Sequence, residues 1–322
     1  MVEIMKTKKI NRVYGVIGIK SIMANWNADF TGRPKTISDG SIYGSDKALK
    51  YPMKRMWDAD GKKVLYLKSY KYNDEKKKDD SAKTIQPNSL PERFSLLFEG
   101  KQDKAVDSKE LIFDLFECLD VENFGATYAA GQNISITGAV QISQGFNKYS
   151  DTSVEVQNIL SPFRDSTKDD ASASTLGTKV VSDEAHYFYG FSVNPTNYND
   201  YTKIDDRIFY SEEAYSSFKE AAIKSATFYN TNSKFGCENE FALFIELKEG
   251  KKLFLPELSQ YIEFTKEDEK NVINLKGMSF LNDLTNDIEK IEIFYNPITT
   301  QVLEDFLVTA KIKTNIITGK DI

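Results

Sequence analysis

Basic side chains, which bind phosphate groups, are concentrated in one stretch of this sequence. From Gly44 to Lys78 there are eleven Lys or Arg residues against five Asp or Glu, although the formal net charge of the chain is −6. Four of them follow one another closely: Lys47, Lys50, Lys54 and Arg55. Clustered cations of this kind supply the electrostatic part of nucleic-acid binding. We therefore expect one basic face on an otherwise acidic protein, with a solvated, non-binding helix face as the alternative.

Residues suited to enzymatic or metal chemistry are scarce. His186 is the only histidine, and the two cysteines, Cys118 and Cys237, are too far apart in sequence to form a CxxC metal pair. The sequence has no phosphate loop, no dinucleotide-binding glycine motif, no HExxH and no GxSxG. Adjacent carboxylates could bind magnesium, but such pairs in polar segments are typical of solvated surface: Asp169 with Asp170, Asp205 with Asp206, Glu212 with Glu213. We predict a protein that is not an enzyme and uses no cofactor or metal.

The basic cluster requires a helix to present it. Ser45 is a suitable N-cap for a helix that extends to Trp57, and Pro52 should kink or shorten that helix. Leu49, Met53 and Met56 then form its buried face, and the basic residues project from the other faces. Before it, a buried strand over residues 12–22 leads into a loop over 23–43 that contains Arg33 and Lys35.

The rest of the chain alternates strands and helices, which predicts an α+β fold with long insertions. Residues 58–107 form a Lys-rich insertion with short apolar islands, and residues 149–183 form a projecting polar hairpin. Strands are expected at 133–147 on both sides of Gly138, and at 186–193, 241–247 and 291–295. Helices are expected at 108–119, 212–229, 280–289 and 299–308.

The size and composition fit one large domain or two small ones, since the 322 residues are 40% hydrophobic. The first twenty residues are basic, but their apolar run is short and interrupted by Gly and Lys, unlike a signal peptide or a membrane helix. We expect a cytoplasmic protein with no membrane partner.

Several segments, in this order, give the chain a resemblance to the CRISPR-associated Cas-seven family, the backbone subunit of type I Cascade complexes, nearest to its type I-B branch. They are NRVYGVIGIK, GSDKALKYPMKRMW with DGKKVLYLK, NFGATYA, SITGAVQISQGFN and TLGTKVVSDEAHYFYGFSVNP. The SITGAVQISQGFN segment is the most specific. A polar insertion also stands where the family has its thumb, so the resemblance covers most of the chain.

This resemblance implies a modified RNA-recognition-motif (ferredoxin-like) palm with a fingers insertion and a thumb β-hairpin. The palm is expected at residues 1–57 and 105–322, the fingers at 58–104 and the thumb at 149–182. Family members stack helically along one guide RNA (crRNA), whose bases pair with the target DNA strand. The resemblance implies further partners: more copies of the chain, the large subunit, subunits that bind the guide ends, and a recruited helicase-nuclease.

The resemblance also implies which residues contact the guide. They are Arg33, Lys47, Lys50, Lys54, Arg55, Gln141, Ser143, Gln144, Phe163, Leu176, Thr178, Lys179, His186 and Lys234. Lys50 and Lys54 are the leading candidates, and Phe163, Leu176, Thr178 and Lys179 are assigned to the thumb. For His186, a packed residue at the start of an aromatic strand is the alternative.

Two other functions remain open. A type III-like relative would cleave target RNA with an acidic residue in the loop after the first strand, and Asp29 occupies that position. A single Asp in a loop is usually a turn residue, which makes this reading weaker. The other alternative is a self-assembling structural protein that needs no RNA.

Overall fold

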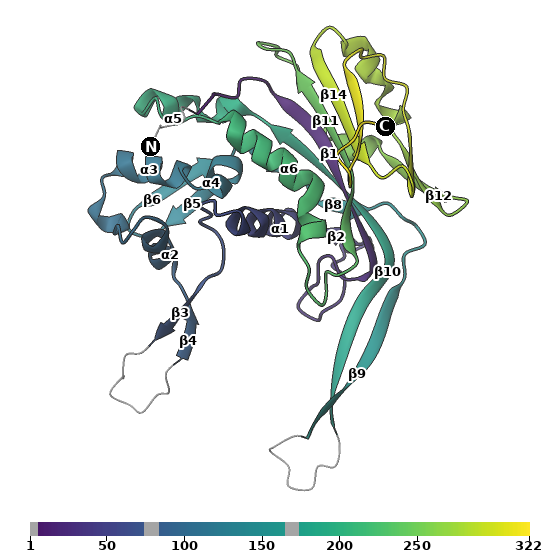
Figure 1. The fold of residues 1–322 in the computed structure, drawn as a ribbon, viewed down its shortest axis with the longest axis horizontal. Coiled ribbons are helices and arrows are strands. Elements are labelled where there is room, and N and C mark those ends of the chain that lie inside the picture. The colour runs from purple at the N-terminus through teal and green to yellow at the C-terminus, as the bar shows by residue number, and fades with distance from the viewer. Residues whose placement is uncertain (1–5, 74–83, 165–173) are drawn as a thin grey trace.

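One long, mostly antiparallel sheet organises the chain (Figure 1). The computed structural model describes residues 6–73, 84–164 and 174–322. Within these, the sheet has the strand order β16-β14-β11-β1-β10-β8-β2, and β7 and β9 also pair with β10. Its strands are β1 (Val13–Ala24), β2 (Tyr43–Gly44), β7 (Val140–Ile142), β8 (Gly145–Asn147), β9 (Val154–Arg164), β10 (Ser174–Val193), β11 (Cys237–Leu247), β14 (Ile288–Tyr295) and β16 (Lys311–Asn315).

Two helices pack on one face of the sheet. They are α1 (Asp46–Ala59) and α6 (Glu212–Phe228), which Ser45 and Ser211 cap as predicted. Leu49 and Met53 of α1 join the same core as Ile17 of β1 and Phe218 of α6. Of the two effects expected of Pro52, a kink or a shorter helix, the shortening does not occur, since α1 continues through Pro52 to Ala59 with Pro52 buried.

The other face of the sheet packs against a smaller C-terminal sheet and two 3₁₀ helices. These elements are β12 (Glu263–Glu267), β13 (Lys270–Asn274), β15 (Thr300–Leu303), η3 (Leu258–Tyr261) and η4 (Lys276–Leu284). Their apolar side chains share a second core with β1, β10, β11 and β14.

Two helix predictions in this region differ from the structure, the one at 299–308 wholly and the one at 280–289 in part. Residues 299–308 contain β15, because Thr300 and Val302 suit a strand and β15 pairs in parallel with β13. Residues 280–289 are divided between η4 and β14, because the backbone turns after Leu284 and Ile288 then pairs with Leu247 of β11. Local periodicity favoured helices at both places, and pairing with distant strands outweighed it.

The segment between α1 and β7 contributes small elements around α1. They are β3 (Tyr70–Asn73), β4 (Thr84–Pro87), α2 (Leu90–Leu97), η1 (Asp103–Ala105), α3 (Ser108–Phe116), α4 (Leu119–Phe124), β5 (Gly125–Ala129) and β6 (Asn133–Thr137). The apolar islands of the predicted insertion belong to the main core, where Val64, Leu65 and Phe94 are buried. Gly138 allows the close backbone approach that was predicted for it, because a Cβ there would collide with the backbone of Phe124.

The predicted hairpin projects from the body of the molecule (Figure 1). Residues 154–164 of β9 pair with the first part of β10, and β10 then continues into the sheet beside β1. The remaining elements, η2 (Pro195–Tyr198) and α5 (Asn199–Ile204), lead from β10 towards α6. In the view of Figure 1, this hairpin and the β3–β4 ribbon extend in the same direction, with α1 between them.

Candidate nucleic-acid interface

The loop between β1 and β2 is held in one conformation by its own polar groups. One carboxylate oxygen of Asp29 accepts hydrogen bonds from the backbone N–H of Thr31 (2.7 Å), the Thr31 hydroxyl (2.7 Å) and the backbone N–H of Arg33 (3.0 Å). These bonds, chiefly the one from the Thr31 hydroxyl, lower the pKa of Asp29. The Asn25 side chain donates to the Gly32 carbonyl at 2.9 Å. Asp29 therefore shapes the turn, and Arg33 is exposed on it.

Lys234 fastens this loop to the loop that follows α6. Its ammonium group donates to the carbonyl oxygens of Asn25 (2.9 Å) and Trp26, and lies 5.1 Å from the Trp26 ring centre. Burial lowers the pKa of Lys234 to about 8. The resemblance implies a guide contact at Lys234; in the structure its half-buried ammonium group binds two loop carbonyls and positions the loop.

A groove lies at the base of the hairpin, where three segments meet. Its larger hollow, of about 780 Å³, is lined by Ile22, Met23, Lys179, Asn230, Thr231, Asn232, Phe235 and Gly236. A second hollow of about 260 Å³ adjoins it, sharing Lys179 and Asn232, and extends along Thr178, Asn25, Ala28 and Gly32. The groove is thus lined by two predicted contacts of the hairpin, Thr178 and Lys179, and by Gly32 of the distant loop, next in sequence to the predicted contact Arg33.

The basic residues of α1 differ in how strongly they are held. Lys50 binds Asp46 (3.0 Å) and lies 5.1 Å from the Phe124 ring centre, and its side chain is 17% exposed. Lys54 lies 3.4 Å from the fully buried carboxylate of Asp120, and its side chain is 16% exposed. The two leading candidates, Lys50 and Lys54, are thus the cations of α1 that carboxylates of the protein hold most closely.

The other two basic residues of α1 are more accessible. Lys47 is exposed, and the Arg55 side chain is 42% exposed with a long, 3.9 Å contact to Asp58. Both can reach a ligand without breaking a buried ion pair.

Gln141, Ser143 and Gln144 lie in a different part of the molecule. Gln141 pairs with Ser192, thirteen positions along β10 from Lys179, a path of about 40 Å along the strand. The Ser143 hydroxyl contacts the Gly190 N–H (2.9 Å) and the Glu257 carboxylate (3.3 Å), on the face covered by the C-terminal sheet. Gln144 is exposed beside Gly145, which pairs with Gly44 just before α1. The structure does not bring these residues into the groove.

The end of the hairpin is described only in part. The backbones of Leu176 and Leu160 pair, and Phe163 belongs to β9. The side chains of Phe163 and Leu176, and residues 165–173 altogether, lie outside the described part of the structure.

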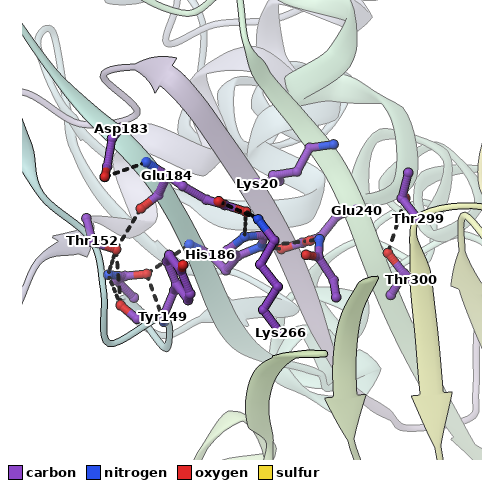
Figure 2. A network of polar contacts seen from close by, with 12 residues as sticks. Lys20, Tyr149, Thr152, Asp183, Glu184, His186, Glu240, Lys266, Thr299 and Thr300 are labelled. Carbon is purple, nitrogen blue, oxygen red and sulfur yellow. Dashed lines mark hydrogen bonds and ion pairs between the residues drawn. The ribbon is translucent and has the colours of Figure 1, made fainter. Parts of the chain in front are cut away.

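The structure places His186 in the protein interior, which corrects its assignment as a guide contact. The ring is fully buried, with Nδ1 2.8 Å from the Glu240 carboxylate and Nε2 3.1 Å from that of Glu184 (Figure 2). Phe264 of β12 stacks on it, with ring centres 4.0 Å apart. Burial opposes the charge of the imidazole, but the two carboxylates outweigh it and raise the pKa of His186. Both ring nitrogens have protein partners, so His186 has no free atom for RNA.

Lys266 extends this network to the surface of the protein. Its ammonium group binds Glu184 at 2.7 Å (Figure 2). Strand β12 is therefore tied to β10 by an ion pair as well as by the stacking of Phe264 on His186. The network fastens the C-terminal sheet to the main sheet.

Comparison with known families identifies the chain. The sequence model of the family described as CRISPR-associated protein Cas7 matches residues 11–279. The chain belongs to this family. The family assignment made from the segments of the sequence is confirmed.

Chains of two solved structures are similar to this one, and the first has a similar fold. A chain of a "CRISPR RNA-guided surveillance complex, pre-nicking" is 14% identical, with a TM-score of 0.51, covering 94% of this chain and 96% of its own. A chain of a "CRISPR RNA-guided surveillance complex" is 12% identical, with a TM-score of 0.44, covering 90% of this chain and 95% of its own. No curated protein sequence matches significantly.

Sequence reasoning missed the apolar residues around the groove of this Cas7 family member. Met23 is 46% exposed, Phe235 is 75% exposed, and Phe30 is completely exposed on the loop after β1. Their exposure depends on how distant loops meet, so no local sequence pattern predicts it.

Over the described residues, no cluster of three or more His, Cys, Asp or Glu side chains could hold a metal ion, and no helix has the length and apolar character to span a membrane.

Proposed function

We propose that this Cas7 family member is the backbone subunit that binds the crRNA in a type I Cascade complex, nearest to type I-B. The observation that carries the proposal is the family match together with the groove at the hairpin base, which is lined by Thr178, Lys179 and Gly32, the residue before Arg33. Within the described part of the chain, neither Arg33 nor Lys179 has a carboxylate at ion-pair distance, which leaves both cations available to phosphates.

We further propose that the main sheet is the modified RNA-recognition-motif (ferredoxin-like) palm. The order β11-β1-β10-β8, with α1 after β1 and α6 between β10 and β11, supports this. In this proposal residues 58–104 are the fingers, residues 149–182 are the thumb hairpin, and residues 1–57 and 105–322 form the palm.

The proposed guide contacts fall into three groups. The first group binds phosphates and riboses directly and consists of Arg33, Thr178, Lys179, Lys47 and Arg55. Lys50 and Lys54 stay bound to Asp46 and Asp120 and add to the positive potential. Gln141, Ser143 and Gln144 would contact a separate segment of RNA. Phe163 and Leu176 belong to the proposed thumb tip, which interrupts stacking of the guide bases. Lys234 positions the loop between β1 and β2, and the buried His186 is not among the proposed guide contacts.

In this mechanism the protein grips the guide without reading its sequence. Phosphate and ribose contacts fix the RNA backbone, and the bases are presented for pairing with the target DNA strand. The net charge of −6 is then borne by surface outside the groove, where it can face basic patches of neighbouring copies. The further proposed partners are the large subunit, the subunits at the guide ends and a recruited helicase-nuclease, all in the cytoplasm.

Cleavage of target RNA at Asp29 is less well supported. One oxygen of this carboxylate already accepts three hydrogen bonds from Thr31 and Arg33, an arrangement that defines a turn. We therefore propose a binding subunit that is not an enzyme.

The proposal is tested by RNA binding across a salt series. The double variant Arg33→Ala/Lys179→Ala should bind single-stranded RNA more weakly, and the slope of log affinity against log salt should fall by about 0.7 for each lost phosphate contact. A matched control, Lys203→Ala/Lys224→Ala, removes two exposed lysines outside the groove.

Comparing the two double variants distinguishes RNA binding in this groove from general electrostatic attraction between RNA and the protein surface. An unchanged slope in the groove variant, or an equal change in the control, would contradict the proposed site. Protein that forms long ordered assemblies after nuclease treatment would favour the RNA-independent structural role instead.

A further inference from the structure

Phe30 is the most exposed large apolar side chain of the described residues, with a relative exposure of 109%. Apolar surface in water costs on the order of 25 cal/mol per Å², so this position contributes nothing to folding through burial. A single exposed apolar side chain is common on protein surfaces, so the case for a contact at Phe30 comes from the loop and the groove around it.

The loop presents Phe30 rigidly. The backbone N–H of Asp29 donates to the Arg33 carbonyl at 2.8 Å, and the N–H of Gly32 donates to the Asp29 carbonyl at 3.2 Å. Ala28 pairs with Pro34 at the base of the turn. A residue that is ordered before binding loses less conformational entropy when it binds. The hydrogen bonds of Asp29 thus prepare Phe30 for a contact.

The surroundings of the turn favour an RNA ligand. Ala28 and Gly32, on either side of Phe30, line the groove together with Lys179. Arg33 follows three residues later and is exposed. An exposed aromatic ring on the same short loop as a cation that has no carboxylate at ion-pair distance among the described residues is suited to stack a base of single-stranded RNA while the adjacent phosphate is neutralised.

We propose that Phe30 is a base-stacking residue for single-stranded RNA held in the groove. This inference rests on the proposed function and adds a contact that does not depend on charge. Because every base has a π-face, the contact would hold any guide sequence. Asp29 is then a positioning residue for Phe30.

The test compares Phe30→Ala with Phe30→Trp in the full-length protein, using short single-stranded RNA that contains 2-aminopurine. Phe254→Ala is the matched control, since Phe254 is 69% exposed elsewhere and lies against Arg12. Phe30→Ala should lower affinity roughly tenfold and relieve quenching of 2-aminopurine at one position, and its salt slope should stay that of the wild type. Phe30→Trp should retain both affinity and quenching.

Each other outcome overturns a defined statement. If Phe30→Ala binds like the wild type while Arg33→Ala/Lys179→Ala flattens the slope, the stacking role is wrong and the groove stands. If Phe30→Ala binds short RNA normally but fewer copies assemble on long RNA, Phe30 contacts a second copy and the stacking role is again wrong. If the wild type binds no RNA, the proposed function itself fails.

Discussion

Ionisable groups are treated differently in two regions of this molecule, the groove at the hairpin base and the interior around His186. In the interior, His186, Glu240, Glu184 and Lys266 satisfy one another between two sheets. In the groove region, the exposed Arg33 and the half-exposed Lys179 have no carboxylate at ion-pair distance among the described residues. Paired charges in the interior hold elements together, whereas unpaired charges at a surface retain their attraction for a ligand. Charge in the first region should therefore affect stability, and charge in the second should affect binding.

The largest expected effect follows from breaking the interior network. His186→Ala leaves the Glu240 carboxylate buried beside Phe264 without its main partner, which should lower the free energy of unfolding by about 3 kcal/mol. Urea unfolding measures this loss, with Lys224→Ala as a control for an exposed pair. The salt slope of RNA binding by the folded variant should not change. A flattened slope would return His186 to the list of guide contacts.

The pH dependence of stability sharpens the same comparison. The folded protein raises the pKa of His186, so it keeps the proton to higher pH than the unfolded chain does. The stabilisation is complete below about pH 6.5 and is lost as the pH rises through the raised pKa, by at most about 1.4 kcal/mol per pH unit. The difference in unfolding free energy between wild type and His186→Phe should follow this trend. A difference that is independent of pH, or that grows with pH, would contradict the buried charged pair.

The smallest expected effect on RNA binding comes from Lys234, the cation near the groove that binds backbone carbonyls of the protein. Lys234→Met keeps the length of the side chain but removes the donor to the Asn25 and Trp26 carbonyls. The loop should loosen, and RNA affinity should fall roughly threefold because the loop then loses more conformational entropy when it binds. The salt slope should stay unchanged, whereas Lys179→Met, as the matched variant, should flatten it. A lower slope for Lys234→Met would make Lys234 a phosphate contact after all.

Much of this organisation could be predicted from local sequence, and the limits have physical causes. The cap at Ser45 and the buried face of α1 are local features, so the helix that presents the basic residues was found. The ion pair of Lys50 with Asp46 follows from their spacing, but that of Lys54 with Asp120 joins residues far apart in sequence.

Burial and strand pairing set the other limits. An isolated histidine in an aromatic strand gives no sign of Glu240, which approaches it from β11. The region 299–308 has a helical pattern, yet its residues 300–303 form a strand because they pair with β13. The groove could not be predicted because the hairpin, the β1 loop and the loop after α6 meet only in the folded chain.

Because β10 runs without a break from the main sheet into the hairpin, the hairpin is a stiff extension of the sheet and has no hinge at its base. The strand has 20 residues, and its inner part is paired with β1 from Ser182 to Val193. Any swing of the hairpin end must bend a strand anchored in the protein core. Two extra residues in each arm would lengthen the hairpin by about 7 Å and keep its faces, whereas one extra residue would turn over every side chain beyond it. The length and facing of the hairpin are thus fixed by counting residues outward from the sheet.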